Sequence, residues 1–451
     1  MSLRSAYQSK AKQALKLALP IIGGQLGQVM MGFFDTVQIG GLGHEYIAGS
    51  GFANNLFWMT NLLGIGITFA VSTLVSEAYG ENHPWKAIGI YRSGVKVALT
   101  VSVIFTLVML AVMKYIHLFG QDESVNLIAL RFLKIMIFST VFVFLFSASK
   151  QLLDGMGRTK IGMYITLGGL ALNVFLNWVL IYGNLGFPRM EIEGTAIATT
   201  VSRVLMTLAF LLIIWRDKRI GELRRQFLAS AEKNKNYVRP ILRIGIPAGL
   251  QFFWEVAAFG AAQIMSGWLG IIDEAAHQIA IGLASITFMV LTGISAAGNI
   301  LTGYSYGAKD REGIRISGNT IFMMTLAIEM IFVIIFLSLH QFLPTLYTDN
   351  EEVLSIASSM LIFAALFQIS DGLQASAAGA LRGMQDVKTP SVIAFIAYWV
   401  VMVPLCYFLA FKTGLGLKGI WIGFIIGLTA AAIALLLRFR IMVDKIEFEE
   451  V

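Results

Sequence analysis

The chain has 451 residues, of which 57% are hydrophobic and 14% are charged, with a formal net charge of +7. Soluble domains carry about 25% charged residues, so this composition excludes an ordinary soluble domain and is typical of a chain surrounded by lipid. The single cysteine, Cys406, excludes an internal disulfide framework.

Apolar stretches long enough to cross a hydrocarbon layer of about 30 Å recur twelve times along the chain. They predict membrane-spanning helices at 14–41, 47–78, 92–113, 126–153, 160–183, 192–215, 240–269, 274–306, 316–338, 353–381, 390–411 and 417–440. No alternation of the β-barrel kind is found. The sequence therefore predicts an all-α integral membrane protein with twelve transmembrane helices.

Lys and Arg residues gather in the connections on one side of the predicted membrane. The even-numbered connections and the two ends of the chain hold 27 of the 34, the odd-numbered connections hold six, and Arg203 lies inside the sixth helix. The positive-inside rule then predicts an inner (plasma) membrane protein with both termini in the cytoplasm. The positive charge is thus a topology signal, and we expect no nucleic-acid partner.

The two halves of the chain repeat one plan on either side of a polar loop at 217–239. LALPIIGGQLGQ in the first half resembles RIGIPAGLQFFWE in the second, which places Pro20 over Pro247. Six helices precede the loop and six follow it, so both halves enter the membrane from the same side. We therefore expect two pseudo-symmetric six-helix lobes, 1–216 and 240–451, joined by a cytoplasmic linker loop.

A few ionisable residues interrupt the apolar spans: Asp35, Glu255, Glu329, Asp371 and Arg203. A charge near the bilayer centre costs roughly 2.5–3.5 kcal/mol on insertion scales, so each of these residues needs a partner, a proton, an ion or a water-filled cavity. The repeat duplicates neither Glu255 nor Asp371, which indicates chemistry rather than packing. We interpret these two acids and Asp35 as functional, against the plainer alternative of acids satisfied by neighbouring hydrogen bonds.

The other two ionisable residues have plainer interpretations. Glu329, in LAIEMIFVI, has no local polar neighbours, so we expect its side chain to snorkel or to form a structural hydrogen bond. Arg203, in TVSRVLM, is interpreted as a buried structural cation or a counter-ion rather than as a substrate contact.

Uncharged polar residues form a second candidate cluster. Asn173 and Asn177 are four residues apart, so both face one side of the fifth helix, and Thr199 follows in the sixth. Carboxylate, amide and hydroxyl oxygens together suit a hard cation such as Na⁺. Amides in membrane helices also serve simple interhelical packing, and both interpretations stay open.

Enzyme and nucleotide motifs are lacking. No GxxxxGK[ST] sequence occurs, so no ATP drive is expected. The five histidines and one cysteine form no metal-binding spacing, and no nucleophile–base pair is evident. We therefore expect a protein that is not an enzyme, with no cofactor and no fixed metal.

The chain resembles the multidrug and toxin extrusion (MATE) family, and within it the NorM-like branch. The motifs that carry the resemblance are ALPIIGGQLGQ and DTVQIGGLG in the first helix, AVSTLVSEAYG closing the second, LDGMGRTK after the fourth, LNVFLNWVLIYG in the fifth, EGTAIAT opening the sixth, AAHQIA at 275–280 and LRGMQDVKTP after the tenth. Together these motifs are specific, whereas any one alone is weak.

The resemblance implies an inner-membrane antiporter that exports small cationic or polyaromatic drugs against inward flow of Na⁺ or H⁺. By resemblance, Glu255 and Asp371 form the cation-coupling site of the second lobe. The first-lobe cation or proton site is implied to consist of Asp35, Asn173, Asn177 and Thr199. We expect the lipid bilayer as the surrounding partner, and a monomer.

One residue departs from the family pattern. Phe367, one helical turn before Asp371, stands where the NorM-like branch is expected to have a tyrosine that helps to hold Na⁺. The second-lobe site thereby loses an oxygen, which weakens the case for Na⁺ against H⁺. Both ions stay open for this site.

Two other functions stay open as alternatives. A flippase for a lipid-linked or polysaccharide substrate shares the broad architecture, but an anionic substrate predicts a cavity rich in Arg and Lys. The acids within the spans instead outnumber Arg203 four to one, which favours cationic cargo. A channel or receptor is the alternative from a different class.

Overall fold

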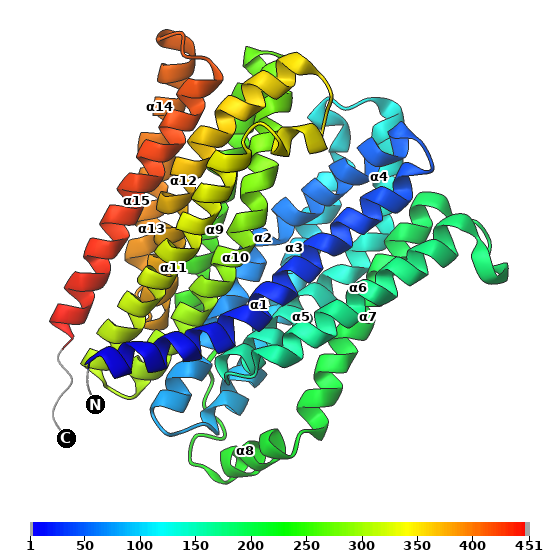
Figure 1. The fold of residues 1–451 in the computed structure, drawn as a ribbon. Helices are drawn as coiled ribbons and strands as arrows, with labels where there is room; N and C mark the ends of the chain where they lie inside the picture. Colours follow the sequence, from blue (N-terminus) through cyan, green and yellow to red (C-terminus); the bar gives the residue numbers. More distant parts are fainter. Residues whose placement is uncertain (1–2, 447–451) are drawn as a thin grey trace. The chain divides into compact units, whose positions relative to one another are not determined.

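The computed structural model describes residues 3–446, and helices make up nearly all of this part of the chain (Figure 1). The helices are α1 (Leu3–Gly40), α2 (His44–Gly80), α3 (Lys86–Lys114), α4 (Glu123–Met136), α5 (Thr140–Gly155), α6 (Thr159–Tyr182), α7 (Glu191–Arg216), α8 (Lys218–Ala229), α9 (Val238–Leu269), α10 (Ile271–Gly307), α11 (Arg311–Leu339), α12 (Glu351–Gly383), α13 (Lys388–Phe395), α14 (Val403–Tyr407) and α15 (Leu417–Lys445). No strand occurs among the described residues, so the predicted all-α fold is confirmed.

Between residues 3 and 446, the part that the structure describes, twelve helical segments are long and apolar enough to cross a membrane. One of them consists of α4 and α5, joined by the 3₁₀ turn Ile137–Ser139. Another runs from α13 through α14 and contains the π-helical segments Ile396–Met402 and Phe408–Lys412. The twelve predicted spans are confirmed, and the chain is a multi-pass membrane protein.

Some helices extend beyond their predicted ranges. α1 begins at Leu3 rather than at residue 14, and α3 begins at Lys86 rather than at residue 92. The added turns of α1, in SAYQSKAKQ, are rich in Ala, Lys and Gln, which are strong helix formers. Hydrophobicity marks only the part of a helix that crosses the membrane, so it does not report these polar turns.

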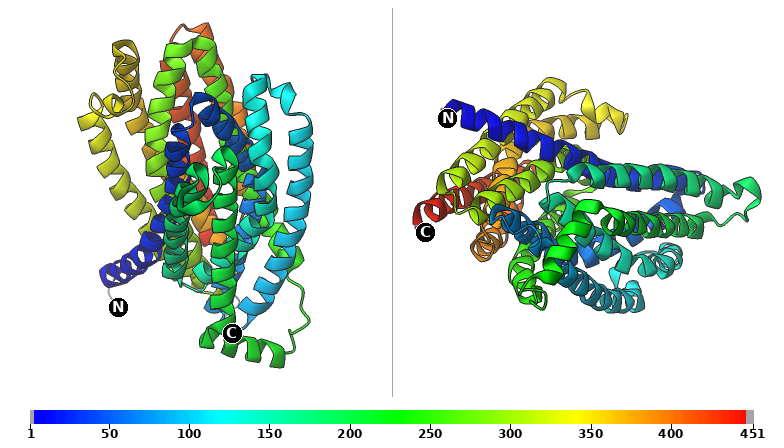
Figure 2. Two further views of the ribbon diagram at one scale, coloured as in Figure 1. Left: turned by 90° about the vertical axis from the view of Figure 1, so that its right-hand side faces the viewer. Right: turned by 90° about the horizontal axis from the view of Figure 1, so that it is seen from below.

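The segment predicted as a polar linker loop contains the helix α8. The side chain of Asp217 caps this helix, because it accepts hydrogen bonds from the backbone amides of Arg219 and Ile220 at 2.9 and 3.1 Å. The apolar residues Ile220, Leu223 and Phe227, spaced three and four apart, are buried. α8 packs against α3 and α7 and lies crosswise to the spans of its unit (Figure 2, left panel, lower edge).

The chain packs into two compact units whose boundaries differ from those predicted. The first unit is residues 23–249, and the second unit joins the residues up to 22 to those from 250 onward. The predicted lobes, 1–216 and 240–451, divide the chain at its polar loop instead. The packing boundaries lie inside α1 and α9, so each of these two helices contributes residues to both units.

Each packing boundary follows a proline inside a helix. Pro20 lies in α1 three residues before Gly23, and Pro247 lies in α9 three residues before Leu250. A proline within a helix removes one backbone hydrogen bond and kinks the helix. The change of unit within α1 and α9 thus coincides with the points at which these helices are weakest.

In the first unit α2 packs against α3, α4 and α5, while α6 packs against α7. The apolar core between these helices contains Phe57, Phe132 and Met136, all of them buried. Glycines allow the backbones of α2 and α9 to approach closely. A Cβ atom added to Gly66 of α2 would lie only 2.4 Å from the Cα atom of Gly249 in α9, so no larger residue fits there. Such close approach is typical of helix pairs in membranes.

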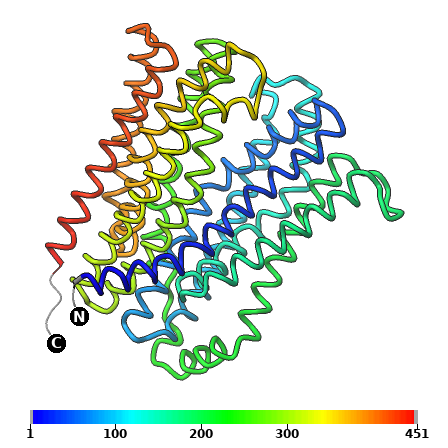
Figure 3. The backbone as a smooth tube through the Cα atoms, viewed as in Figure 1, coloured from blue at the N-terminus to red at the C-terminus, as the bar shows by residue number. Residues whose placement is uncertain are grey.

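In the second unit α12 packs against α10, α11 and α15, which lie side by side in Figure 1. The first turns of α1 belong to this unit, because Lys10 Nζ lies 3.5 Å from Ser305 Oγ and Asn319 donates to the Tyr7 hydroxyl at 3.4 Å. Figure 3 shows the start of α1 beside the start of α11. The apolar core of the unit includes Trp421 and Phe424.

Candidate functional site

The four predicted residues of the first-lobe site lie together in the first unit. Asp35 comes from α1, Asn173 and Asn177 from α6, and Thr199 from α7. Asn177 donates to Asp35 Oδ1 at 2.5 Å, and the hydroxyl of Thr199 donates to Asp35 Oδ2 at 3.1 Å. Asn173 in turn donates to the Thr199 hydroxyl at 3.2 Å. The carboxylate is therefore held by two neutral donors that come from two different helices.

This first-unit cluster is buried and retains oxygens without donors. Asp35 is 4% exposed and both asparagines are 0% exposed. The amide oxygens of Asn173 and Asn177 have no hydrogen-bond partner among the described residues. Buried oxygens without donors are costly unless a proton or a cation reaches them. One carboxylate and two amide oxygens are the ligand types that a hard cation accepts.

Arg203 lies near this cluster without forming an ion pair with it. Its guanidinium donates to Ser139 Oγ at 2.9 Å and lies over the ring of Phe57, 4.9 Å from the centroid. It also interacts electrostatically with Asp35. These contacts fit its interpretation as a structural cation or counter-ion.

The two predicted acids of the second lobe lie together in the second unit. Glu255 comes from α9 and Asp371 from α12, and they are 5% and 4% exposed. The side-chain amide of Gln374 donates to Glu255 Oε1 at 3.2 Å and to Asp371 Oδ1 at 3.4 Å, so a single amide bridges both carboxyls. Gln374 was not among the predicted site residues.

One basic side chain, Arg382, acts on this pair. Arg382 is buried, lies over the ring of Phe252 at 5.3 Å and interacts electrostatically with Glu255. Two carboxyls that share one neutral donor in a buried site cannot both stay charged without a proton or another cation. The arrangement therefore leaves room for a mobile positive charge.

Aromatic side chains surround the acids of the second unit. Phe367 packs edge-on against Phe259 and Trp421, with ring centroids 6.0 and 5.7 Å apart, and it offers no oxygen. Tyr398 is 0% exposed, its hydroxyl has no hydrogen-bond partner among the described residues, and it interacts electrostatically with Glu255 and Asp371. Tyr398 was also missed by sequence reasoning.

The position of Tyr398 coincides with an irregularity in its helix. It lies in the π-helical segment Ile396–Met402, near the centre of its span. π-Helical turns within longer helices are frequent at functional sites. Position 367, where a tyrosine was expected, holds a phenylalanine. The hydroxyl of another tyrosine, Tyr398, lies within electrostatic reach of the same two acids.

Glu329 does not behave as the sequence analysis expects. It is 0% exposed, so it does not snorkel, and neither of its carboxyl oxygens has a hydrogen-bond partner among the described residues, so it forms no structural bond. The expectation was wrong because the neighbours of Glu329 come from another helix. It lies against Gly372 of α12, the residue that follows Asp371.

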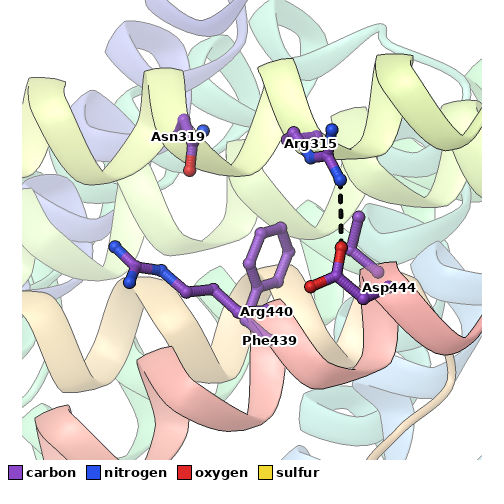
Figure 4. Close-up of a pocket in the computed structure, with 6 residues that line it drawn as sticks. Arg315, Asn319, Phe439, Arg440 and Asp444 are labelled. Atoms are coloured by element: carbon purple, nitrogen blue, oxygen red, sulfur yellow. Dashed lines mark hydrogen bonds and ion pairs between the residues drawn. The ribbon is translucent and has the colours of Figure 1, made fainter.

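A cavity of about 220 Å³ lies elsewhere in the second unit, between α11 and α15. It is lined by Arg315, Asn319, Phe439, Arg440, Val443 and Asp444. Figure 4 shows the ion pair of Arg315 with Asp444, whose atoms are 3.0 Å apart. Arg315 and Glu329 are about 21 Å apart along α11, at 1.5 Å per residue, so this cavity is separate from the acid cluster.

A family model matches the chain twice. The MatE model matches residues 20–179 and again residues 247–408, so its two matches begin at Pro20 and Pro247, 227 residues apart. Each match falls in one half of the chain, in agreement with the duplication that the sequence shows.

Curated relatives match over nearly the whole length. The chain is 31% identical over 447 residues to a probable multidrug resistance protein NorM of Agrobacterium fabrum, covering 98% of this chain and 96% of that protein. It is 32% identical over 434 residues to the multidrug resistance protein NorM of Vibrio cholerae, covering 95% of both chains.

Solved structures share the fold. The eukaryotic MATE transporter AtDTX14 superposes with a TM-score of 0.87 at 18% identity, covering 98% of both chains. A multidrug resistance MATE family transporter of the MOP superfamily, in an outward-facing conformation, superposes with a TM-score of 0.87 at 22% identity, covering 96% of both chains. With the family model and the two NorM relatives, these findings show that the chain belongs to the MatE family and is a NorM-like MATE transporter, not an enzyme.

Proposed function

We propose that this transporter is a secondary active antiporter that exports cationic or polyaromatic compounds in exchange for Na⁺ or H⁺. The observation that carries the proposal is the buried pair Glu255 and Asp371, two carboxyls bridged by the neutral amide of Gln374. The names of its two relatives, multidrug resistance proteins, support drugs as the class of cargo.

The chemistry of exchange follows from this charge arrangement. An inbound cation neutralises the pair, and its departure leaves two buried negative charges that attract the next cation, whether drug, Na⁺ or H⁺. A cationic drug and a coupling ion that compete for one negative site exchange without further machinery. Inward movement of one positive charge releases about 2.3 kcal/mol per 100 mV of membrane potential, which can drive export.

The first-unit cluster is proposed as a second coupling site. Asp35 is surrounded there by the amides of Asn173 and Asn177 and the hydroxyl of Thr199. The two amide oxygens without donors support a Na⁺ site, while the buried carboxylate also supports a proton site. The two sites lie in different units, so either unit can carry the ion.

The proposed setting is the inner membrane, with both termini in the cytoplasm and a monomeric chain that uses no ATP. The excess of Lys and Arg on one side of the spans supports this orientation. The two six-helix lobes, 1–216 and 240–451, are proposed as the halves of the transport cycle, although their outermost residues, 1–2 and 447–451, lie outside the described residues.

Transport in reconstituted vesicles tests this function. Liposomes that contain the purified protein are loaded with ethidium. Ethidium export is then followed under an imposed Na⁺ gradient alone and under a pH gradient alone. We expect counterflow with at least one gradient, and its loss in Glu255→Gln and Asp371→Asn. Glu312→Gln serves as the control, because Glu312 is an acid of the second unit that pairs with Arg315 at the surface.

The outcomes separate the alternatives. Ethidium flux that runs down its own gradient and ignores both ion gradients would indicate a channel. No ethidium flux, together with movement of an anionic lipid-linked sugar, would indicate a flippase. Unchanged export by Glu255→Gln would remove the acid pair from the mechanism.

A further inference from the structure

We propose that Glu329 is a third ion-coupling carboxyl of the second unit, which holds a proton in the state described here and exchanges it with the Glu255–Asp371 pair. The role in coupling rests on the antiport function proposed above. The presence of the proton rests only on the surroundings of Glu329.

The proton on Glu329 follows from burial. The side chain is 0% exposed, and neither of its oxygens has a hydrogen-bond partner among the described residues. No Lys, Arg or His of the described residues forms an ion pair with it. An isolated charged carboxylate in an apolar interior is so costly that the group takes up a proton instead. Glu329 is therefore a neutral carboxylic acid in this state.

Gly372 makes the space in which this carboxyl lies. A Cβ atom added to Gly372 would lie 2.7 Å from Glu329 Oε1 and 3.0 Å from its Cγ. The carboxyl thus lies directly against the backbone of α12, at the residue next to Asp371. A side chain at position 372 would displace the Glu329 carboxyl from this contact.

Asp371 is the titratable group that acts on Glu329. Among the elements packed on α11, α12 contributes Asp371, whose carboxyl interacts electrostatically with Glu329. Within the described residues, α10 and α15 contribute no titratable group with such an interaction. One turn along the same helix pair, Thr325 and Ser376 share a hydrogen bond of 2.6 Å between their hydroxyls. Polar groups therefore continue from Glu329 along the contact between α11 and α12.

The exchange itself is a proton transfer between two carboxyls. When the coupling cation leaves Glu255 and Asp371, two adjacent negative charges remain, and their repulsion is relieved if one of them moves away. The O–H bond on Glu329 breaks, a new O–H bond forms on Asp371, and the negative charge appears on Glu329. No oxidant or further reactant is needed, and the total charge of the three acids is unchanged.

A glutamine at position 329 distinguishes coupling from space filling. Glu329→Gln keeps the size and neutrality of the protonated side chain but cannot donate a carboxyl proton. A purely structural role predicts no change, whereas a coupling role predicts the loss of one exchangeable proton. Gly372→Ala is the second variant, because it leaves Glu329 in the sequence while displacing its carboxyl.

Two measurements on the whole protein test the proposal. Infrared difference spectra between the unaltered protein and Glu329→Gln, at neutral pH in detergent, should show the band of a protonated carboxyl. On addition of NaCl or of ethidium, infrared difference spectra of the unaltered protein should show the band of protonated Asp371 replaced by the band of protonated Glu329. This exchange of bands should be lost in Glu329→Gln and weakened in Gly372→Ala. Glu312→Gln should show the same exchange of bands as the unaltered protein.

Each outcome tests one part of the proposal. A missing carboxyl band would overturn the proton on Glu329. A band of protonated Glu329 without any exchange of bands in the unaltered protein, or with an exchange that survives in both variants, would overturn its role in coupling. If ethidium export ignores both gradients, the antiport function fails and the coupling role with it, while the infrared band still reports the proton on Glu329.

Discussion

Asn177 Nδ2 lies 2.5 Å from Asp35 Oδ1, although 142 residues separate the two in the chain. The second oxygen of Asp35 accepts from Thr199, so α6 and α7 each supply one donor to a carboxylate on α1. The donors fix the orientation of this carboxylate within the first unit.

Replacing Asn177 should therefore loosen both the fold and the site. Asn177→Ala removes a hydrogen bond to a charged group, worth roughly 1.5–3 kcal/mol, and leaves Asp35 with one donor. We expect a lower unfolding temperature in detergent and slower ethidium export in vesicles. Thr36→Ala is the control, because Thr36 is exposed beside Asp35 and bonds only the carbonyl of Gly32. Equal behaviour of the two variants would argue against this role of Asn177.

The first-unit cluster was predictable because its signals are local. A lone Asp in an apolar helix stands out from its neighbours, and two asparagines four apart must share a helix face. The positions of Asp35, Asn173, Asn177 and Thr199 then follow once three helices pack together. Whether that cluster binds an ion depends on chemistry that neither spacing nor packing determines, so the assignment stays a prediction.

Tyr398 leads to a prediction with two opposite effects. Its buried hydroxyl has no partner among the described residues, and such a group costs about 1 kcal/mol or more. Tyr398→Phe should therefore raise the unfolding temperature slightly. It should also weaken Na⁺-driven export severalfold if the hydroxyl serves the acids in place of the missing oxygen at Phe367. Thermal unfolding and the Na⁺ dependence of ethidium export measure the two effects.

Tyr407→Phe is the matched control for this prediction, because Tyr407 lies in the same span but is 45% exposed. It should change neither quantity. A Tyr398→Phe protein that is less stable than the unaltered one would show that the hydroxyl has a partner in the folded protein, and would argue against its role as a free ligand.

The sequence does not predict the contacts of Gln374 and Glu329, because these contacts depend on how neighbouring helices are aligned against each other. Gln374 follows Asp371 by three residues and so shares its face, which is a usable signal, but its bridge to Glu255 depends on how α9 meets α12. Glu329 was interpreted from its own apolar segment, whereas its contacts come from Gly372 in a distant part of the chain. Similarly, the helix count could be predicted from length and apolarity, but the unit boundaries inside α1 and α9 could not.

Glycines at the crossing of α2 and α9 give a test of packing. A Cβ atom on Gly245 would lie 2.4 Å from the carbonyl oxygen of Ile67, a backbone atom that cannot rotate away. Gly245→Ala should therefore destabilise the protein by about 1–3 kcal/mol, as overpacking does. Gly260→Ala, in the same helix α9 with no atom within 4 Å of its added Cβ, should be neutral or slightly stabilising. Thermal unfolding of both variants in detergent checks the contrast, and equal effects would contradict it.

Asp217 connects α8 to the spans in a way that depends on pH. It caps α8 and forms an ion pair with Arg158 at 2.7 Å. Burial alone would raise the pKa of Asp217, but the Arg158 guanidinium and the backbone amides of Ile220 and Arg219 outweigh it and hold the pKa below the usual 3.8. A carboxyl with a depressed pKa stabilises the folded state fully above its unfolded pKa, and this stabilisation is lost as the pH falls through its folded pKa.

We therefore expect α8 to stay docked at neutral pH and to detach below about pH 4, as Asp217 takes up a proton. Hydrogen exchange of the α8 amides across pH measures this, after correction for intrinsic exchange rates. Asp217→Asn keeps the cap but loses the ion pair, so its α8 protection should be weaker at pH 7 and should change little toward acid pH. Asp217→Ala also removes the N-cap of α8, which should lower the stability of the docked helix by roughly a further 0.5–2 kcal/mol, the cost of losing one N-cap.

Glu222→Gln should behave like the unaltered protein, because Glu222 pairs only within α8, with Arg225 at 3.3 Å. An α8 that remains equally protected in Asp217→Asn at every pH would show that Ile220, Leu223 and Phe227 hold the helix without help from the ion pair.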